Sequence, residues 1–132
     1  MKRLKMLVVE DEPVLLDQAA DFFDLYTNID IFKAKTGEEA VEIIYKEKPD
    51  IIILDLKLGD PPAIDGIGVM RKLRKFDNLT TDVIVMTALR DVNLEAEALM
   101  LGARIYFKKP FESQLLFDVV DTILKERDVR KY

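Results

Sequence analysis

The stretch Asp50-Ile51-Ile52-Ile53-Leu54-Asp55 decides the fold, because four consecutive large apolar residues run directly into a carboxylate. A strand without polar alternation is typical of a parallel sheet that is covered by helices on both faces. Asp55 then stands where this strand emerges from the core. A carboxylate in that position needs an explanation beyond folding.

Other short apolar segments read as strands of the same sheet, and helical periodicity fills the intervals between them. The expected strands are 4–9, 30–34, 50–54, 83–86 and 104–108, and the expected helices are 13–26, 36–48, 66–75, 91–102 and 111–127. Five repeats of strand and helix with short connections predict an α/β fold, a doubly wound five-stranded parallel sheet flanked by five helices. In the first helix, the spacing predicts an apolar face made of Val14, Leu15, Ala19, Phe22, Phe23 and Tyr26.

Composition limits the class of protein. A chain of 132 residues with 49% hydrophobic content fits one domain with a single core. The formal net charge of -5 argues against broad attraction to nucleic acid or to an anionic membrane. The chain has no cysteine and no histidine, which excludes disulfides, thiolate nucleophiles and a histidine general base, and leaves oxygen ligands for a hard cation. No apolar run is long enough for a signal peptide or a membrane span, so a cytoplasmic location is expected.

Polar residues at other strand ends are expected to meet Asp55, because ligands of such sheets bind at the carboxyl ends of the strands. Glu10 and Asp11 follow the first strand, Thr87 follows the fourth and Lys109 follows the fifth. The acids could hold Mg²⁺, and the ammonium could contact a phosphoryl oxygen. Taken alone, each residue also fits an ordinary role as a helix start, a strand end or a solvated cation. Together they suggest phosphate chemistry at an aspartate.

From about residue 4 to residue 124, the chain resembles the receiver domain of two-component response regulators, including the single-domain chemotaxis regulators. The matching motifs are Val8-Val9-Glu10-Asp11-Glu12, Ile53-Leu54-Asp55-Leu56, Asp65-Gly66, Met86-Thr87-Ala88, and Gly102-Ala103 followed by Tyr106-Phe107-Lys108-Lys109-Pro110-Phe111. The resemblance implies a flavodoxin-like strand order of 2-1-3-4-5. It also implies that residues 1–126 form the receiver domain and that 127–132 are a tail or the start of a linker to an output domain.

The resemblance further implies a role for each site residue. Asp55 would accept a phosphoryl group from a histidine kinase or a histidine phosphotransfer protein. Glu10, Asp11, Asp55 and the backbone carbonyl of Lys57 would hold Mg²⁺, and Lys109, which directly precedes Pro110, would contact the phosphoryl group. Thr87 and the ring of Tyr106 would then switch the surface made by the fourth helix, fifth strand and fifth helix.

The expected protein is therefore a signalling phosphoacceptor rather than an enzyme, capable at most of self-phosphorylation from a donor and of autodephosphorylation. Its expected partners are the phosphodonor and a downstream protein or output domain, with no direct contact to nucleic acid and none to a membrane. A phosphorylation-dependent dimer is one expected assembly. However, Arg104-Ile105 stands where many DNA-binding regulators carry the paired aspartates of a symmetric dimer contact.

Two further features depart from the family pattern or bear on how long the phosphoryl group lasts. The segment from Asp55 to Asp65-Gly66 is about three residues longer than the family usually shows, and Gly59-Asp60-Pro61-Pro62 replaces the customary lone proline. Lys57 and Leu89 occupy positions that the resemblance associates with phosphoryl lifetime, and a large apolar Leu89 predicts slow loss of phosphate.

Two alternatives stay open from the sequence. A pseudo-receiver that is never phosphorylated could act as a protein-interaction module. A phosphatase or phosphotransferase with an aspartyl nucleophile is the other alternative, although Lys57 stands where such enzymes usually carry a second aspartate. A glycine-rich phosphate loop of the Gly-Lys-Ser/Thr kind is absent from the sequence.

Overall fold

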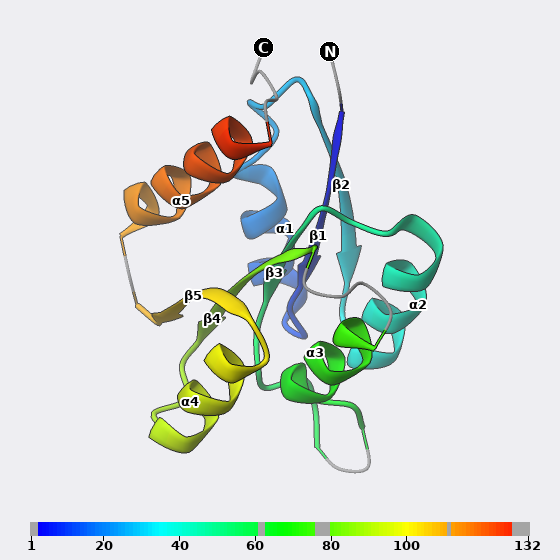
Figure 1. Ribbon diagram of the computed structural model, residues 1–132, viewed down its shortest axis with the longest axis vertical. Coiled ribbons are helices and arrows are strands. Elements are labelled where there is room, and N and C mark those ends of the chain that lie inside the picture. Colours follow the sequence, from blue (N-terminus) through cyan, green and yellow to red (C-terminus); the bar gives the residue numbers. More distant parts are fainter. Residues whose placement is uncertain (1–2, 61–62, 76–79, 111, 128–132) are drawn as a thin grey trace.

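The computed structural model describes residues 3–60, 63–75, 80–110 and 112–127, which form one parallel sheet with helices on both faces (Figure 1). The strand order is β2-β1-β3-β4-β5, the flavodoxin-like order. The strands are β1 (Leu4–Val9), β2 (Ile29–Ala34), β3 (Ile51–Leu54), β4 (Asp82–Thr87) and β5 (Ala103–Lys108). The helices are α1 (Pro13–Asp21), α2 (Gly37–Glu47), α3 (Gly66–Arg74), α4 (Val92–Met100) and α5 (Ser113–Glu126). The fold predicted from the sequence is confirmed.

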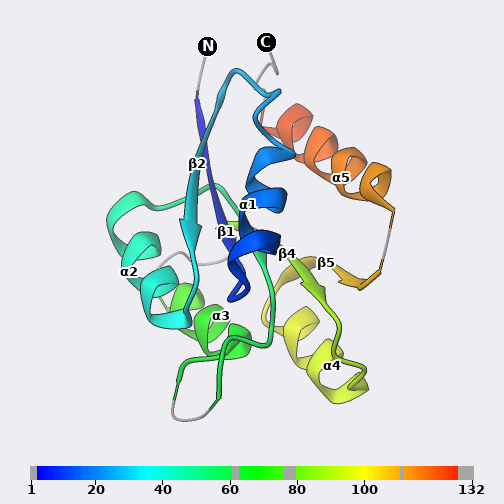
Figure 2. The same cartoon turned by 180° about the vertical axis from the view of Figure 1, so that it is seen from behind.

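The two faces of the sheet carry separate apolar clusters, which explains the unbroken hydrophobic runs in the central strands. One cluster packs under α2, α3 and α4, and the other packs under α1 and α5. Figures 1 and 2 show the two groups of helices from opposite sides. All four residues of β3 are fully buried, as expected for the middle strand of such a sheet.

The predicted face of α1 is partly wrong. The helix ends at Asp21 instead of continuing to Tyr26, and turns follow it. Its buried positions are Leu16 and Ala20, followed by Phe23 in the turn, whereas Val14 and Leu15 are exposed. The spacing of four and then three residues from Leu16 defines a helical face that Val14 and Leu15 do not share.

Helix ends follow recognisable capping chemistry. Glu12 caps α1 by accepting from the backbone N–H groups of Val14 and Leu15, and Pro13 occupies the first turn. Thr36 caps α2 as the capping-box pattern predicted. The expected cap after α4 is also present, since Gly102 has a φ of 91° that glycine adopts without a steric penalty.

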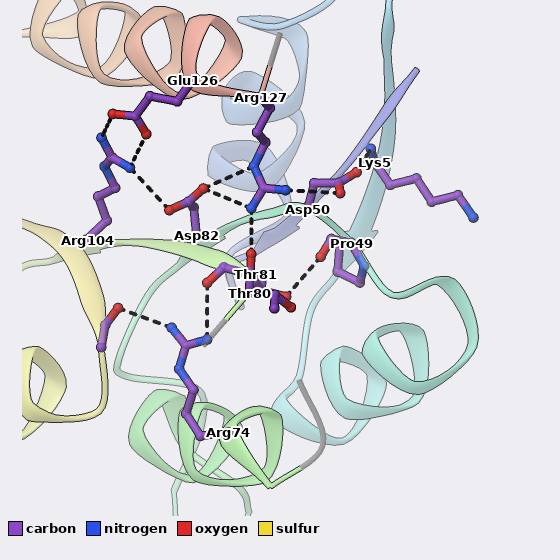
Figure 3. Close-up of polar contacts among 11 residues, drawn as sticks. Lys5, Pro49, Asp50, Arg74, Thr80, Thr81, Asp82, Arg104, Glu126 and Arg127 are labelled. Carbon is purple, nitrogen blue, oxygen red and sulfur yellow. Dashed lines mark hydrogen bonds and ion pairs between the residues drawn. The ribbon is translucent and has the colours of Figure 1, made fainter. Parts of the chain in front are cut away.

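A polar network fastens the end of α5 to the edge of the sheet opposite the candidate site (Figure 3). Arg127 pairs with Asp50 at 3.3 Å and with Asp82 at 2.9 Å, while Arg104 binds both carboxylate oxygens of Glu126 at 2.5 and 2.6 Å. Arg127 thus contacts the segments that lead into β3 and β4. The rest of the expected C-terminal tail, 128–132, lies outside the described residues.

Within the described parts of the chain, none of the helices has both the length and the apolar character that a membrane span requires.

Candidate functional site

Parallel pairing brings four of the predicted site residues to one edge of the sheet. Glu10 and Asp55 directly follow the neighbouring strands β1 and β3, Thr87 ends β4, and Lys109 follows β5. Backbone hydrogen bonds continue the pairing past the strand ends, from the Asp55 N–H to the Val9 carbonyl at 3.1 Å. The Lys109 N–H likewise donates to the Thr87 carbonyl at 2.8 Å. These side chains therefore start from fixed backbone positions.

The Lys109 ammonium joins two carboxylates at this edge. Its Nζ donates to Glu10 Oε1 at 2.8 Å and to Asp55 Oδ2 at 3.0 Å. The side chains of Glu10 and Asp55 are only 9% and 11% exposed, and that of Lys109 is 26% exposed. Lys108, by contrast, is exposed and lies 3.6 Å from Glu95. Of the two adjacent lysines, Lys109 is the one that enters the site.

Burial and the shared charge shift the pKa values of this cluster. Burial raises the pKa of the Glu10 carboxyl, and the nearby Asp55 charge adds to that rise, although Lys109 opposes it. Burial lowers the pKa of the Lys109 ammonium, but its contacts with Glu10 and Asp55 outweigh this effect, and the net shift of the pKa is upward. One cation therefore serves two carboxylates, and the cluster carries one surplus negative charge.

Asp55 is held from its other side by backbone. Its Oδ1 accepts the Lys57 N–H at 3.1 Å, while the Lys57 side chain is exposed. Asp11 is also exposed, next to the buried Glu10. Among the described residues, no three carboxylates converge closely enough to hold a metal ion. The donor set still suits Mg²⁺ chemically, because Glu10, Asp11 and Asp55 supply only oxygen ligands.

Thr87 and Tyr106 lie near the carboxylates without bonding to them in this structure. Thr87 is fully buried, and its Oγ1 accepts the Leu89 N–H at 3.2 Å. The Tyr106 ring packs against the same apolar cluster as Leu89, and its hydroxyl is buried with no hydrogen-bond partner among the described residues. Burial raises the pKa of the Tyr106 hydroxyl, and the charges of Glu95, Asp91 and Asp55 raise it further.

An open groove leads from the surface to Asp55. It has a volume of about 290 Å³ and lies between α1 and Lys109-Pro110, with Leu15 and Phe22 among its apolar lining. Leu15 and Phe22 are 44% and 39% exposed. The Asp55 carboxylate, although buried, thus borders a groove with a largely apolar lining that opens to the surface.

The long segment after Asp55 closes on itself. The Gly66 N–H donates to the Leu56 carbonyl at 2.9 Å, and Leu56 and Leu58 are buried. Gly59 has a φ of 83°, which favours glycine at that turn. Pro61 and Pro62, the unusual part of this segment, lie outside the described residues, as does Phe111 of the last matching motif.

Sequence reasoning missed one set of contacts around the site. The backbone N–H of Ile64 donates to Glu38 Oε2 at 3.1 Å, which joins the long segment to the start of α2. The capping-box pattern marked Glu38 only as part of a helix start, and no local signal in the sequence pairs it with Ile64.

Comparison with known proteins agrees with this architecture. The family model for the response regulator receiver domain matches residues 6–121. The chain is 32% identical over 127 residues to sporulation initiation phosphotransferase F of Bacillus subtilis (strain 168), covering 94% of this chain and 96% of that protein. Three further curated relatives are longer, and the chain spans about half of their length (51%, 48% and 45%).

Solved structures give the same result. The receiver domain of the Francisella response regulator 1452 is 30% identical, with a TM-score of 0.80 over 95% of this chain and 99% of that one. A CheY-like response regulator receiver domain protein from Methanospirillum hungatei JF-1 reaches a TM-score of 0.83 over 96% of this chain and 98% of that one. At 22% identity, the second likeness shows the fold alone.

The matched residues include most of β1, the other four strands and the four polar residues that meet at their carboxyl ends, so the chain belongs to the response regulator receiver domain family of two-component signalling.

Proposed function

We propose that this domain is a phosphoacceptor switch in which Asp55 receives a phosphoryl group from a histidine kinase or a histidine phosphotransfer protein. The observation that carries the proposal is the contact of one ammonium, that of Lys109, with both Glu10 and Asp55 at the mouth of an open groove. In the transfer, an Asp55 carboxylate oxygen attacks the donor phosphorus. The bond from phosphorus to the donor nitrogen breaks, and an acyl phosphate remains on Asp55.

The electrostatic demand of this step accounts for the residues around Asp55. A carboxylate that attacks a phosphoryl group brings two negative charges together, so catalysis depends on positioning and on offsetting charge. Lys109 supplies a positive charge beside the attacking oxygen, and the Lys57 N–H orients the other oxygen of Asp55. The chain itself lacks histidine, and none is needed, since the donor carries it.

Mg²⁺ is the cofactor that we propose for the reaction. Asp11 and Asp55, together with Glu10 and the backbone carbonyl of Lys57, would hold it and would complete the neutralisation that Lys109 alone leaves unfinished. The surplus negative charge of the cluster supports this assignment, because a divalent cation would be attracted to it. When bound, the ion would also shield the oxygens of the incoming phosphoryl group.

The proposed readout starts from Thr87 and Tyr106. A phosphoryl group on Asp55 would offer strong acceptor oxygens to the Thr87 hydroxyl, whose oxygen now accepts the Leu89 N–H. If Thr87 turned toward the phosphoryl group, the Tyr106 side chain could repack with it and change the surface of α4, β5 and α5, since its buried hydroxyl has no hydrogen-bond partner in the described part of the chain to hold it in place. Partners on that surface, or an output domain joined to residues 1–126, would receive the signal. The proposed role is signalling in the cytoplasm rather than enzymatic turnover.

Phosphorylation with acetyl phosphate tests the proposal. The protein is incubated with acetyl phosphate and Mg²⁺, and its intact mass is measured beside that of Asp55→Asn. The expected result is a gain of one phosphoryl group by the wild type and none by the variant. An unchanged wild-type mass would favour the pseudo-receiver, and steady turnover of small phosphoesters would favour the phosphatase.

A further inference from the structure

The long segment that follows Asp55 is fastened to α2, a helix that contributes nothing to the candidate site. Ile64 makes the contact, since its backbone N–H donates to Glu38 Oε2 at 3.1 Å. Gly37 is buried and lies so close to Ile64 that a Cβ at Gly37 would overlap the Ile64 carbonyl oxygen. The Ile64 side chain packs on the apolar cluster under α2 and α3. Backbone and side chain of one residue thus tie the segment to the start of α2.

The near end of the same segment touches the acceptor. The Lys57 N–H donates to Asp55 Oδ1 at 3.1 Å, and the Gly66 N–H donates to the Leu56 carbonyl at 2.9 Å. A Cβ at Gly66 would overlap the Asp55 carbonyl oxygen and the Leu56 Cα. The loop is therefore closed tightly beside Asp55, and Ile64, two residues before Gly66, is where Glu38 holds it.

The N-terminal cap of α2 is made without the Glu38 side chain. Thr36 Oγ1 already accepts the Glu39 N–H at 3.0 Å, and Glu39 Oε1 accepts the Lys35 N–H at 3.1 Å. The first is the N-cap bond of the capping box, and the second ties Glu39 back to the residue before the N-cap. The Glu38 carboxylate is exposed and is used on the loop instead. Its contact with Ile64 is thus separate from the capping of α2.

We propose that Glu38 is a positioning residue for phosphoryl transfer. By holding Ile64, it fixes the loop in which the backbone N–H of Lys57 orients the Asp55 carboxylate. Positioning matters unusually in this reaction, because the protein contributes little covalent chemistry beyond the nucleophile. This inference rests on the proposed function of Asp55. It gives the extended loop a restraint that lies outside the carboxylate cluster.

The test compares three variants in the phosphorylation reaction with acetyl phosphate and Mg²⁺. Glu38→Ala removes the acceptor for the Ile64 N–H, whereas Glu38→Gln keeps an oxygen that can accept it. Glu42→Ala is the matched control, because Glu42 is an exposed acid on the same helix that pairs with Lys46 at 3.0 Å, away from the loop. Rates are measured over a range of acetyl phosphate concentrations, at a temperature where all four proteins are folded.

We expect Glu38→Ala to lower the maximal rate roughly fivefold at an unchanged apparent KM, as the loss of one orienting hydrogen bond would do. Glu38→Gln should recover most of the rate, and Glu42→Ala should match the wild type. Amide hydrogen exchange at Ile64 should be faster in Glu38→Ala, with no change at Val85 in the core.

Two results would overturn the inference while leaving the proposed function standing: a wild-type rate in Glu38→Ala, or a Glu38→Gln rate no better than that of Glu38→Ala. A wild type that gains no phosphoryl group would instead remove the proposed function, and the inference with it.

Discussion

Replacing Lys109 with methionine should destabilise the folded protein, because it removes the one ammonium that two buried carboxylates share. Methionine keeps most of the volume of the side chain and deletes its charge. Breaking a fully buried ion pair costs about 3–5 kcal/mol, and losing an exposed pair costs about 0–1 kcal/mol. Lys109 is 26% exposed, while the carboxylates of Glu10 and Asp55 are 9% and 11% exposed. We therefore expect the free energy of unfolding to fall by about 2 kcal/mol near neutral pH.

The loss should depend on pH. The raised pKa of Glu10 means that this carboxyl takes up its proton early as the pH falls, and Lys109 then has one negative charge fewer to neutralise. The difference in stability between wild type and variant should therefore shrink in acid. Urea unfolding near neutral pH and in acid measures this, and a loss of about 2 kcal/mol corresponds to a midpoint shift of about 1 M.

Lys108→Met is the control for this experiment. Lys108 is the adjacent lysine, exposed and 3.6 Å from Glu95, and its replacement should change stability by less than about 0.5 kcal/mol. Equal effects of the two substitutions, or a Lys109→Met loss that does not shrink in acid, would refute the reasoning that Lys109 neutralises a surplus of buried negative charge.

Glu10, Tyr106 and Leu89 each lead to a further prediction. Because the pKa of Glu10 is raised, the stability that this carboxyl contributes is present below its ordinary pKa of 4.5 and is lost as the pH rises through the raised value. Glu10→Gln should therefore raise the urea midpoint at neutral pH but not in acid, and a lower midpoint at neutral pH would contradict this. Tyr106→Phe removes a buried hydroxyl without a partner among the described residues and should stabilise the protein by about 1 kcal/mol in urea unfolding, whereas a loss of stability would reveal a missed hydrogen bond. Leu89 lines a cavity of about 140 Å³ together with Lys57, and its large apolar side chain should hinder water there. We therefore expect slow loss of phosphate from the phosphorylated protein and faster loss in Leu89→Asn. Following the mass of the phosphorylated protein over time checks this, and a wild-type half-life of seconds would count against it.

The parallel sheet, and the meeting of the polar residues at one of its edges, could be predicted from the pattern of strands and helices. An unbroken apolar run such as Ile51–Leu54 has few options other than a covered parallel strand, and parallel strands bring their carboxyl ends to one edge. The placement of Glu10, Asp55 and Lys109 within bonding distance follows from that geometry once the order of the strands is known.

Features that depend on competition between similar side chains were not predictable. Val14 and Leu15 are as apolar as Leu16, and only the packing of α1 on the sheet decides that Leu16 is buried. The bond from Ile64 to Glu38 joins residues that are 26 positions apart and depends on the path of an irregular loop. Neither choice leaves a periodic signal in the sequence.

The most direct test of the central claim is to identify the residue that carries the phosphoryl group. The protein is phosphorylated with acetyl phosphate and Mg²⁺ and then treated with borohydride, which reduces an acyl phosphate on aspartate to homoserine, and its peptides are sequenced by mass spectrometry. We predict homoserine at position 55, and only when both the phosphodonor and Mg²⁺ are present. Homoserine at another aspartate, or an unmodified Asp55 in protein that has been exposed to both, would contradict the account.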